Sequence, residues 1–329
     1  MLCLHAAGLG ELVAAALSVD VQAHVLYTDD SAVLVDTKTS TVMIGRLPYL
    51  KNCFAVVGSV PRRGDLRQSV DAVSRQVPRW SLRLSGQPFR LMFSEDGRLA
   101  TVPTNVRGRL ESAVSQATGG RFTPRGGGDE YWMITRRDLD QVLFTQRLPR
   151  PAAKPPPKGA LAQDVASLIV SATGPNSPTD VVLDPFAGTG ALIAARVQQP
   201  FREAICADIG YSDGSVRLMP ELTGRSGVRQ LAEDVRTLPS VRTRSVDVVV
   251  TDPPWGEFDQ TIGSTDAFFA QALGTISRVL RPGGRLAMLI ARQLEDQLGR
   301  QWTDHELELV RSFRLLVNGH PATLIAGHR

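Results

Sequence analysis

Hydrophobic positions in the first 150 residues recur with two different periods, which indicates a domain that mixes helices with strands. Leu66, Val70, Val73 and Val77 recur at the spacing of one helical face, so the sequence predicts a helix over residues 65–77. Apolar or alternating runs predict strands, and these cover residues 32–36, 54–60, 89–93, 131–135 and 141–145. Further helices are expected over 11–17 and 105–117. The first half of the chain therefore predicts a small α+β domain.

After residue 160 the pattern changes to a strict alternation of strands and helices. Residues 246–251 contain four valines and a threonine, and this run is apolar enough to be buried on both faces of a sheet. Other strands are expected over 181–184, 204–208, 228–232, 284–291, 313–317 and 322–326, and helices over 160–171, 191–197 and 267–280. Such alternation predicts an α/β fold, a Rossmann-like, doubly wound and mainly parallel sheet.

A proline-rich segment separates the two patterns. Residues 147–159, RLPRPAAKPPPKG, contain five prolines, which lack an amide proton and have a fixed φ. Neither a helix nor a sheet can run through such a segment. We therefore expect an α+β domain over 1–146, a linker over 147–157 and the doubly wound domain over 158–329.

Positive charge is concentrated in the first half of the chain. Residues 1–150 contain 19 Lys and Arg against 14 Asp and Glu, whereas residues 151–329 contain 18 against 19. Residues 61–125 contain twelve arginines, five acids and no lysine, a net charge of +7. Because arginine forks suit phosphate groups, this favours a polyanionic partner that docks on the N-terminal half. A general arginine-rich composition of the protein explains the positive charge of this segment equally well, without a polyanionic partner.

Metal, disulfide and membrane chemistry have no support in the sequence. Cys3, Cys53 and Cys206 are far apart and form no CxxC pair, and the five histidines are scattered. No stretch approaches the roughly 20 apolar residues that a membrane helix needs. The apolar N-terminus lacks a basic segment and contains Glu11, so we expect a first strand and helix there rather than a signal peptide. A cytoplasmic location is the expectation.

The first motif with chemical content lies between an expected strand and helix, and reads Asp184-Pro185-Phe186-Ala187-Gly188-Thr189-Gly190. Its glycines let the backbone approach a ligand, and the following helix start offers free amides. A dinucleotide loop would read GxGxxG, whereas this loop has two glycines and opens with an acid. That acid would repel a pyrophosphate but suits the positively charged amino group of S-adenosylmethionine.

Two more acids follow the next two expected strands. Asp208 comes 24 residues after Asp184, where an acid commonly binds ribose hydroxyls, and Asp234 is placed to accept from an adenine amino group. Each acid alone could be a helix cap, but three in order at successive strand ends favour one cofactor site. The expected cofactor-binding residues are Asp184, Pro185, Phe186, Gly188, Gly190, Asp208, Ile209, Asp234 and Val235.

The second motif follows the apolar strand 246–251 and consists of Asp252, Pro253, Pro254 and Trp255. An aryl amine is a poor nucleophile because its lone pair is delocalised into the ring. Hydrogen bonds from the amine to the Asp252 carboxylate and the Pro253 carbonyl would orient that lone pair towards a methyl donor. Trp255 offers a face on which a base can stack. These four residues are the expected catalytic residues. The alternative is a structural proline-rich loop.

The motif pair DPFAGTG and TDPPWG, in that order, resembles the class I amino-methyltransferases. Within them the chain is most similar to the tRNA guanine-N2 methyltransferases that join a THUMP RNA-binding domain to the catalytic domain. Residues 158–161 resemble the segment that closes over the cofactor, and residues 129–136 resemble the last N-terminal strand. The resemblance implies S-adenosylmethionine as cofactor, a tRNA substrate methylated on guanine N2 and an N-terminal RNA-binding domain. Trp255 stands where many members have tyrosine, which leaves the exact base open.

Other activities remain as alternatives. A DNA or ribosomal RNA methyltransferase acting on adenine N6 uses the same motif pair, although DNA enzymes usually carry a further domain within or after the catalytic one. A protein glutamine methyltransferase has Asn where Asp252 stands, and a dehydrogenase needs GxGxxG. An RNA 5-methylpyrimidine enzyme needs a thiolate, and no cysteine lies near either motif. A catalytically retired RNA-binding protein is the non-enzyme alternative, against which the intact motifs argue. No protein partner is implied.

Overall fold

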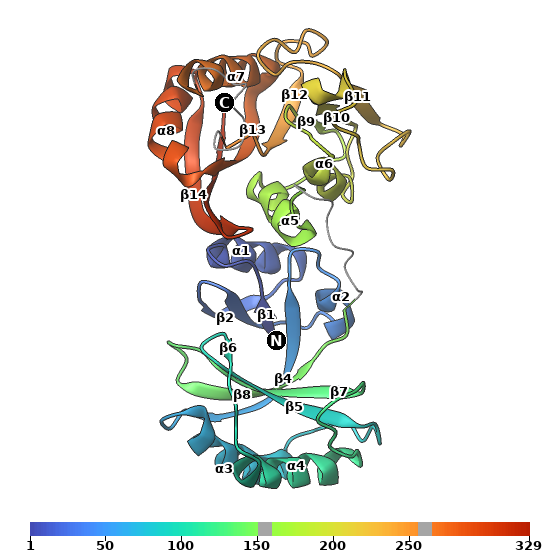
Figure 1. Cartoon of the computed structure of the whole chain (residues 1–329), viewed down its shortest axis with the longest axis vertical. Helices are drawn as coiled ribbons and strands as arrows, with labels where there is room; N and C mark the ends of the chain where they lie inside the picture. Colours follow the sequence, from blue (N-terminus) through green and yellow to red (C-terminus); the bar gives the residue numbers. More distant parts are fainter. Residues whose placement is uncertain (151–159, 256–264) are drawn as a thin grey trace. The chain divides into compact units, whose positions relative to one another are not determined.

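The computed structural model describes residues 1–150, 160–255 and 265–329, and Figure 1 shows their helices and strands. The described residues form two compact units. One comprises residues 1–5 and 17–150, and the other comprises 6–16, 160–255 and 265–329. Residues 151–157 of the expected linker lie outside the described residues, as do Lys158, Gly159 and Gly256.

An eight-stranded sheet forms the N-terminal unit, with the strand order β2-β3-β1-β4-β8-β7-β5-β6. Neighbouring strands are antiparallel except β5 and β7, which are parallel. The strands are β1 (Leu2–Leu4), β2 (His24–Thr28), β3 (Ala32–Asp36), β4 (Asn52–Pro61), β5 (Phe89–Glu95), β6 (Arg98–Leu99), β7 (Asp129–Thr135) and β8 (Gln141–Arg147). The helices here are α2 (Thr41–Gly45), α3 (Leu66–Gln76) and α4 (Thr104–Thr118), while α1 (Gly10–Asp20) follows β1 in the chain.

Helices α3 and α4 cover one face of this sheet, below β5, β7 and β8 in Figure 1. Helix α3 begins where the Asp65 side chain accepts a hydrogen bond from the backbone N–H of Gln68 at 3.0 Å. Its four predicted apolar positions are all buried, and they pack with α4 against strand residues such as Phe89 and Phe144. Helix α4 ends at Gly119, whose φ of 69° suits glycine. The helical period predicted for this segment is confirmed.

The C-terminal unit is a seven-stranded sheet with the order β11-β10-β9-β12-β13-β15-β14. The first five strands in that order are parallel, and β15 is antiparallel to both of its neighbours. The strands are β9 (Val181–Asp184), β10 (Glu203–Ala207), β11 (Val228–Leu231), β12 (Val246–Thr251), β13 (Leu280–Ala291), β14 (Glu308–Val317) and β15 (His320–His328). The helices are α5 (Gln163–Ala172), α6 (Ala191–Arg196), α7 (Thr265–Val279) and α8 (Glu295–Asp304).

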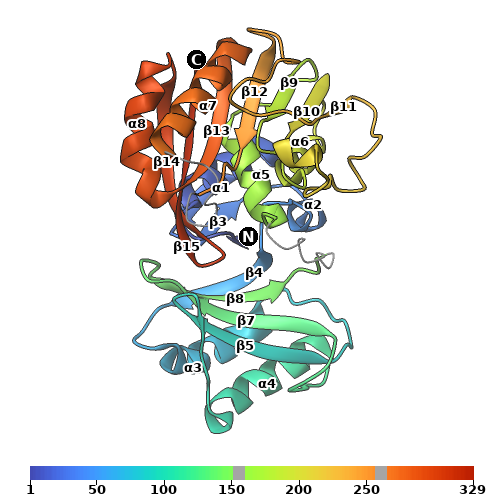
Figure 2. The same cartoon turned by 45° about the horizontal axis from the view of Figure 1, so that its top comes forward.

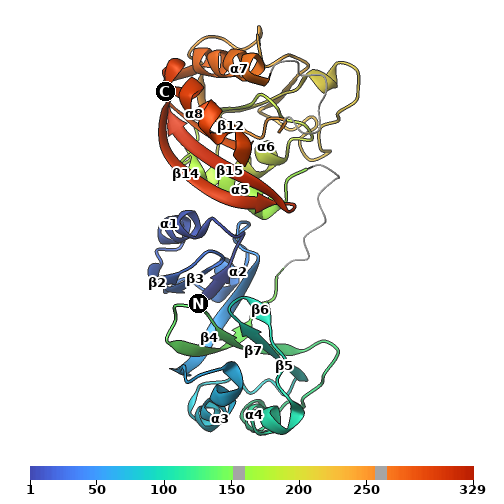
Figure 3. The same cartoon turned by 60° about the vertical axis from the view of Figure 1, so that its left-hand side comes forward.

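The chain runs outward from the centre of this sheet in two directions, and this decides where a ligand can bind. It goes from β9 through β10 to β11 on one side, and from β12 to β13 on the other. Because crossovers are right-handed, the helices of the two halves cover opposite faces, as Figures 2 and 3 show for α6 and α7. The reversal lies between β9 and β12. Doubly wound sheets bind their ligands at such a point, beyond the carboxyl ends of the strands.

The predicted fold class is confirmed, and strands β9 and β12 have the predicted bounds. Four of the helices and strands named above had no prediction, namely β2, β6, α2 and α8. Strand β2 pairs only with β3 and carries partly exposed residues, so no clear alternation marks it. Helix α8 buries only Leu298 and Trp302 and contains Gly299, which weakens the helical pattern. Within the described ranges, no helix is long and apolar enough to cross a membrane.

Candidate active site

Both predicted motifs lie at the point where the C-terminal sheet reverses direction. Asp184 is the last residue of β9, and Asp252 follows the last residue of β12. The two strands are hydrogen-bonded neighbours, with Val249 opposite Leu183. Because parallel strands end at one edge of a sheet, the two acids belong to the same edge.

Asp184 is a buried carboxyl group without a cation in the part of the chain that the structure describes. Its side chain is 1% exposed and accepts a hydrogen bond from the backbone N–H of Phe186 at 3.1 Å. Burial raises the pKa of Asp184 to about 8, and the negative charges of Asp252 and Asp208 add to this against the opposing Phe186 N–H. A positively charged ligand would reverse that shift.

The glycine loop after Asp184 depends on two left-handed residues. Gly188 has a φ of 52° and Gly190 a φ of 88°. A Cβ atom at Gly190 would lie 2.6 Å from a methyl group of Leu222, whereas a Cβ atom at Gly188 would meet nothing within 4 Å. Gly190 is therefore required by close packing. Gly188 leaves open space beside the backbone, as a ligand-binding loop does.

Two side chains from the next loop hold the peptide of Gly188. The Asp208 carboxylate accepts from the Gly188 N–H at 2.8 Å, and the Tyr211 hydroxyl donates to the Gly188 carbonyl at 2.7 Å. The other Asp208 oxygen accepts from the Gly210 N–H at 2.8 Å. A carboxylate has about four acceptor positions, so Asp208 can still accept from ribose hydroxyls. Tyr211 had no prediction, since no sequence pattern marks a residue that reaches back to the preceding loop.

The remaining predicted cofactor residues follow β10 and β11. Ile209 is 60% exposed and lies next to Asp208, where an apolar side chain can cover a ligand. Asp234 binds Arg236 in an ion pair, and its backbone carbonyl accepts from Thr237 and Leu238 N–H groups. The Arg236 side chain and backbone lower the pKa of Asp234. No helix begins at Asp234, so the alternative of a helix cap is wrong; its side chain instead accepts from the Arg236 N–H in a turn at 2.8 Å, and its role towards a cofactor stays a prediction. Val235 is buried.

In the described part of the loop after β12, the first residue is hydrogen-bonded to the fourth. The Trp255 indole Nε1 donates a hydrogen bond to the Asp252 Oδ1 at 2.9 Å. The two prolines between them fix two φ angles of the loop. Trp255 is half-buried and packs against the apolar core below α7. Burial raises the pKa of Asp252 to about 7, and the Trp255 hydrogen bond opposes that rise.

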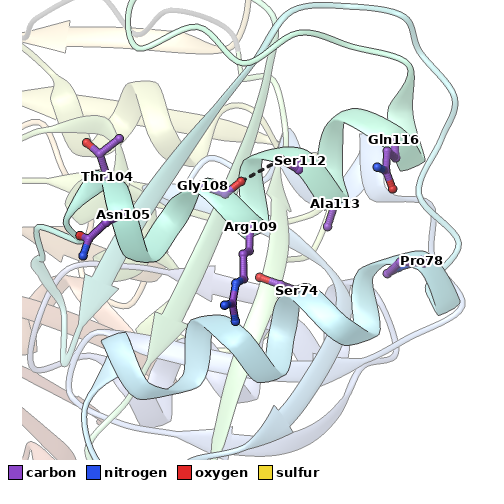
Figure 4. Close-up of a pocket in the computed structure, with 9 residues that line it drawn as sticks. All are labelled: Ser74, Pro78, Thr104, Asn105, Gly108, Arg109, Ser112, Ala113 and Gln116. Carbon is purple, nitrogen blue, oxygen red and sulfur yellow. Dashed lines mark hydrogen bonds between the residues drawn. The ribbon is translucent and has the colours of Figure 1, made fainter.

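A hollow of about 570 Å³ lies in the N-terminal unit, between helices α3 and α4. Figure 4 shows small and polar side chains along it, with Arg109 from α4 reaching across towards α3. Arg109 forms an ion pair with Asp71 at 3.2 Å, and both side chains are exposed. The lining residues are Ser74, Pro78, Thr104, Asn105, Gly108, Arg109, Ser112, Ala113 and Gln116. This hollow is open to solvent, unlike the position of the buried Asp184.

Residues 222–314 match a family model described as "RMKL-like, methyltransferase domain". TrmN from Thermus thermophilus is similar in structure, with a TM-score of 0.72 and 19% identity over 100% of this chain and 98% of that chain. A possible methylase from Clostridium difficile 630 has a TM-score of 0.67 and 10% identity over 99% and 97% of the two chains. SMU.472, solved in complex with SAH, has a TM-score of 0.63 and 12% identity over 99% and 97%. No curated protein matches the sequence.

At these identities the likeness to solved structures shows the fold. The matched family segment contains Asp234 and the loop from Asp252 to Trp255, and it begins after the glycine loop that ends at Gly190. The family model and the fold agree that the C-terminal unit is a methyltransferase domain. The predicted class of enzyme, a methyltransferase, is confirmed.

Proposed function

We propose that this chain transfers a methyl group from S-adenosylmethionine to an exocyclic amine of an RNA base, with guanine N2 in tRNA as the favoured target. The observation that carries the proposal is the pair of acids at the reversal point of the sheet, of which Asp184 is buried and Asp252 is partly buried. Asp184 and Asp252 have no cation partner among the described residues, and both have raised pKa values. Perturbed acids at a ligand-binding edge are typical of functional sites.

The residues around Gly188 fit S-adenosylmethionine, which supplies an electrophilic methyl group on a positively charged sulfur. The buried Asp184 carboxylate attracts the cofactor's ammonium group, because a cation relieves the cost of ionising this side chain. The backbone at Gly188 lies open, and the Asp208 and Tyr211 hydrogen bonds hold its peptide in place. SMU.472, a similar structure, holds SAH, and this supports the same cofactor family here.

The loop from Asp252 to Trp255 positions the amine. The Asp252 carboxylate and the Pro253 carbonyl each accept a hydrogen bond from the amine, so the nitrogen lone pair points at the methyl carbon. A nitrogen–carbon bond forms while the carbon–sulfur bond breaks, and the sulfur keeps the electron pair. The surplus amine proton passes to the Asp252 carboxylate, whose pKa of about 7 suits a proton acceptor near neutral pH. The positioning of the amine against the methyl carbon supplies most of the acceleration of methyl transfer.

The N-terminal unit binds the RNA backbone, in the role of the THUMP-type domain that the sequence resembles. Arg67 and Arg75 lie on helix α3, Arg79 ends the short helical turn after it, and all three are exposed. None of them forms an ion pair with a described residue. Free arginine forks on one helical surface suit successive phosphates.

The test is transfer of a labelled methyl group from S-adenosylmethionine to unmodified tRNA, ribosomal RNA and DNA, followed by nucleoside analysis. Label in N2-methylguanosine from tRNA is the expected result. Label only in N6-methyladenine of DNA or ribosomal RNA would overturn the substrate but keep the amine chemistry. Tight cofactor binding without transfer to any of the three would favour the retired RNA-binding protein.

A further inference from the structure

The hydrogen bond between Trp255 and Asp252 gives the tryptophan a role beyond that of a stacking surface. The indole N–H is the one side-chain donor that reaches this carboxylate within the part of the chain that the structure describes. It engages Oδ1 at 2.9 Å and leaves the other oxygen available to a substrate. The donor is also fixed, because the indole packs against the core cluster and two prolines limit the loop.

We propose that Trp255 is a positioning residue whose indole N–H holds the Asp252 carboxylate in the orientation, and in the ionised form, that accepts the amine. The inference rests on the proposed function, in which Asp252 accepts the amine hydrogens. It assigns the ring and the N–H to different tasks. The ring face stacks on the base, and the N–H acts through Asp252.

The charges around Asp252 make this donor important. Strand β12 lies between β9 and β13. Strand β9 ends at Asp184, and Arg292 follows the end of β13, where its guanidinium donates to the Leu315 carbonyl at 3.5 Å. Asp208, a further acid, follows β10. Among the described residues, no arginine, lysine or histidine forms an ion pair with Asp252. Burial raises the pKa of Asp252 to about 7, and the Trp255 N–H is the group that opposes the rise. Without the Trp255 N–H, no hydrogen bond or ion pair from a described side chain favours the ionised form of Asp252.

The first test needs neither the cofactor nor methyl transfer. The protein is labelled with 15N at its four tryptophan indoles, and the Trp255 signal is assigned from its loss in Trp255→Phe. We expect the shift of the Trp255 Nε1–H signal to titrate with an apparent pKa near 7, and to lose this titration in Asp252→Asn. A Trp255 signal that does not change between pH 5 and 9 would overturn the inference while leaving the proposed function untouched.

The second test separates the N–H from the ring in catalysis. Trp255→Phe keeps an aromatic face but removes the donor, so the acid limb of the kcat profile should move up by about one pH unit. Transfer should then fall by up to about tenfold at pH 7 and recover by pH 9. Trp302→Phe is the matched control, because Trp302 is buried in the same core cluster and its Nε1 has no hydrogen-bond partner among the residues that the structure describes. An equal loss of kcat at every pH in Trp255→Phe would reduce Trp255 to a stacking surface.

Discussion

Acids that are buried or partly buried differ in their partners between the two units of this chain. In the N-terminal unit Asp29 accepts two hydrogen bonds from Arg136 at 2.6 Å, and Arg90 and Arg147 bind Glu130. Burial of Asp29 opposes ionisation, but Arg136, the Ser31 N–H and the Tyr27 hydroxyl together lower its pKa to about 2. In the C-terminal unit Asp184 is buried and Asp252 is partly buried, neither has such a partner among the described residues, and the pKa values of both are raised.

The difference points to the candidate site without reference to any motif. A paired buried acid is structural, because its charge is balanced within the protein. Asp180 shows that the C-terminal unit also pairs its structural acids, since it binds Arg196 and Arg285 and its pKa is lowered. Asp184 and Asp252 have no cation partner among the described residues and lie at the edge of the candidate site. Under the proposed function their partners are the ligands, a cation at Asp184 and an amine at Asp252.

The strongest way to break this comparison is to remove the acid assigned to the amine. Asp252→Ala should lower methyl transfer about 10³-fold, because the amine loses its acceptor and its orientation. Affinity for S-adenosylmethionine, measured by calorimetry, should stay within about twofold. Asp213→Ala, at an exposed acid of the same unit, is the control that should retain activity. Full activity in Asp252→Ala would remove this residue from the mechanism.

The second test concerns the cation site at Asp184. The folded-state pKa of Asp184 is raised, so protonation stabilises the fold at low pH, and this stabilisation is lost as pH rises through about 8. A bound cation favours the ionised form, so cofactor affinity should rise with pH up to that point. Asp184→Asn should weaken binding about tenfold at pH 8 and flatten this part of the pH dependence.

Thermal unfolding without cofactor tests the same residue through its effect on the stability of the fold. The amide of Asp184→Asn carries no charge to bury, so without cofactor the variant should be more stable than the wild type at pH 8.5. The gain in Tm should be about 2–4 °C for each kcal/mol and should largely disappear by about pH 4, where the carboxyl group is protonated in both the folded and the unfolded state. A variant that is less stable than the wild type at both pH values would show that Asp184 is paired like Asp29.

The smallest effect is expected at the arginines of the N-terminal unit. Each of Arg67→Gln, Arg75→Gln and Arg79→Gln should weaken RNA binding several-fold at low salt and reduce the slope of log K against log salt by about 1. Fluorescence anisotropy with unmodified tRNA measures both quantities. Arg300→Gln, on the exposed side of α8 in the other unit, is the matched control. Equal slopes for all four variants would contradict phosphate docking on α3.

Local sequence patterns were sufficient for much of the fold, and the strongest cases are instructive. Strands β9 and β12 were predicted with correct bounds because central parallel strands are apolar on both faces and end sharply at an acid. Helix α3 was predicted because its buried face repeats every three or four residues. Strand β2, on the contrary, has no clear period, since an edge strand is half exposed and is stabilised by pairing with β3.

The sequence by itself determined which residues stand at the candidate site, because each motif residue directly follows a recognisable strand. Only the tertiary structure decided how they interact. That Asp208 and Tyr211 hold the Gly188 peptide, that Asp234 binds Arg236, and that Trp255 donates to Asp252 depends on how loops from different strands meet. Burial without a cation likewise depends on the whole fold around Asp184 and Asp252. Local patterns specify strands and turns, whereas desolvation and pairing of charges arise from contacts between residues distant in the chain.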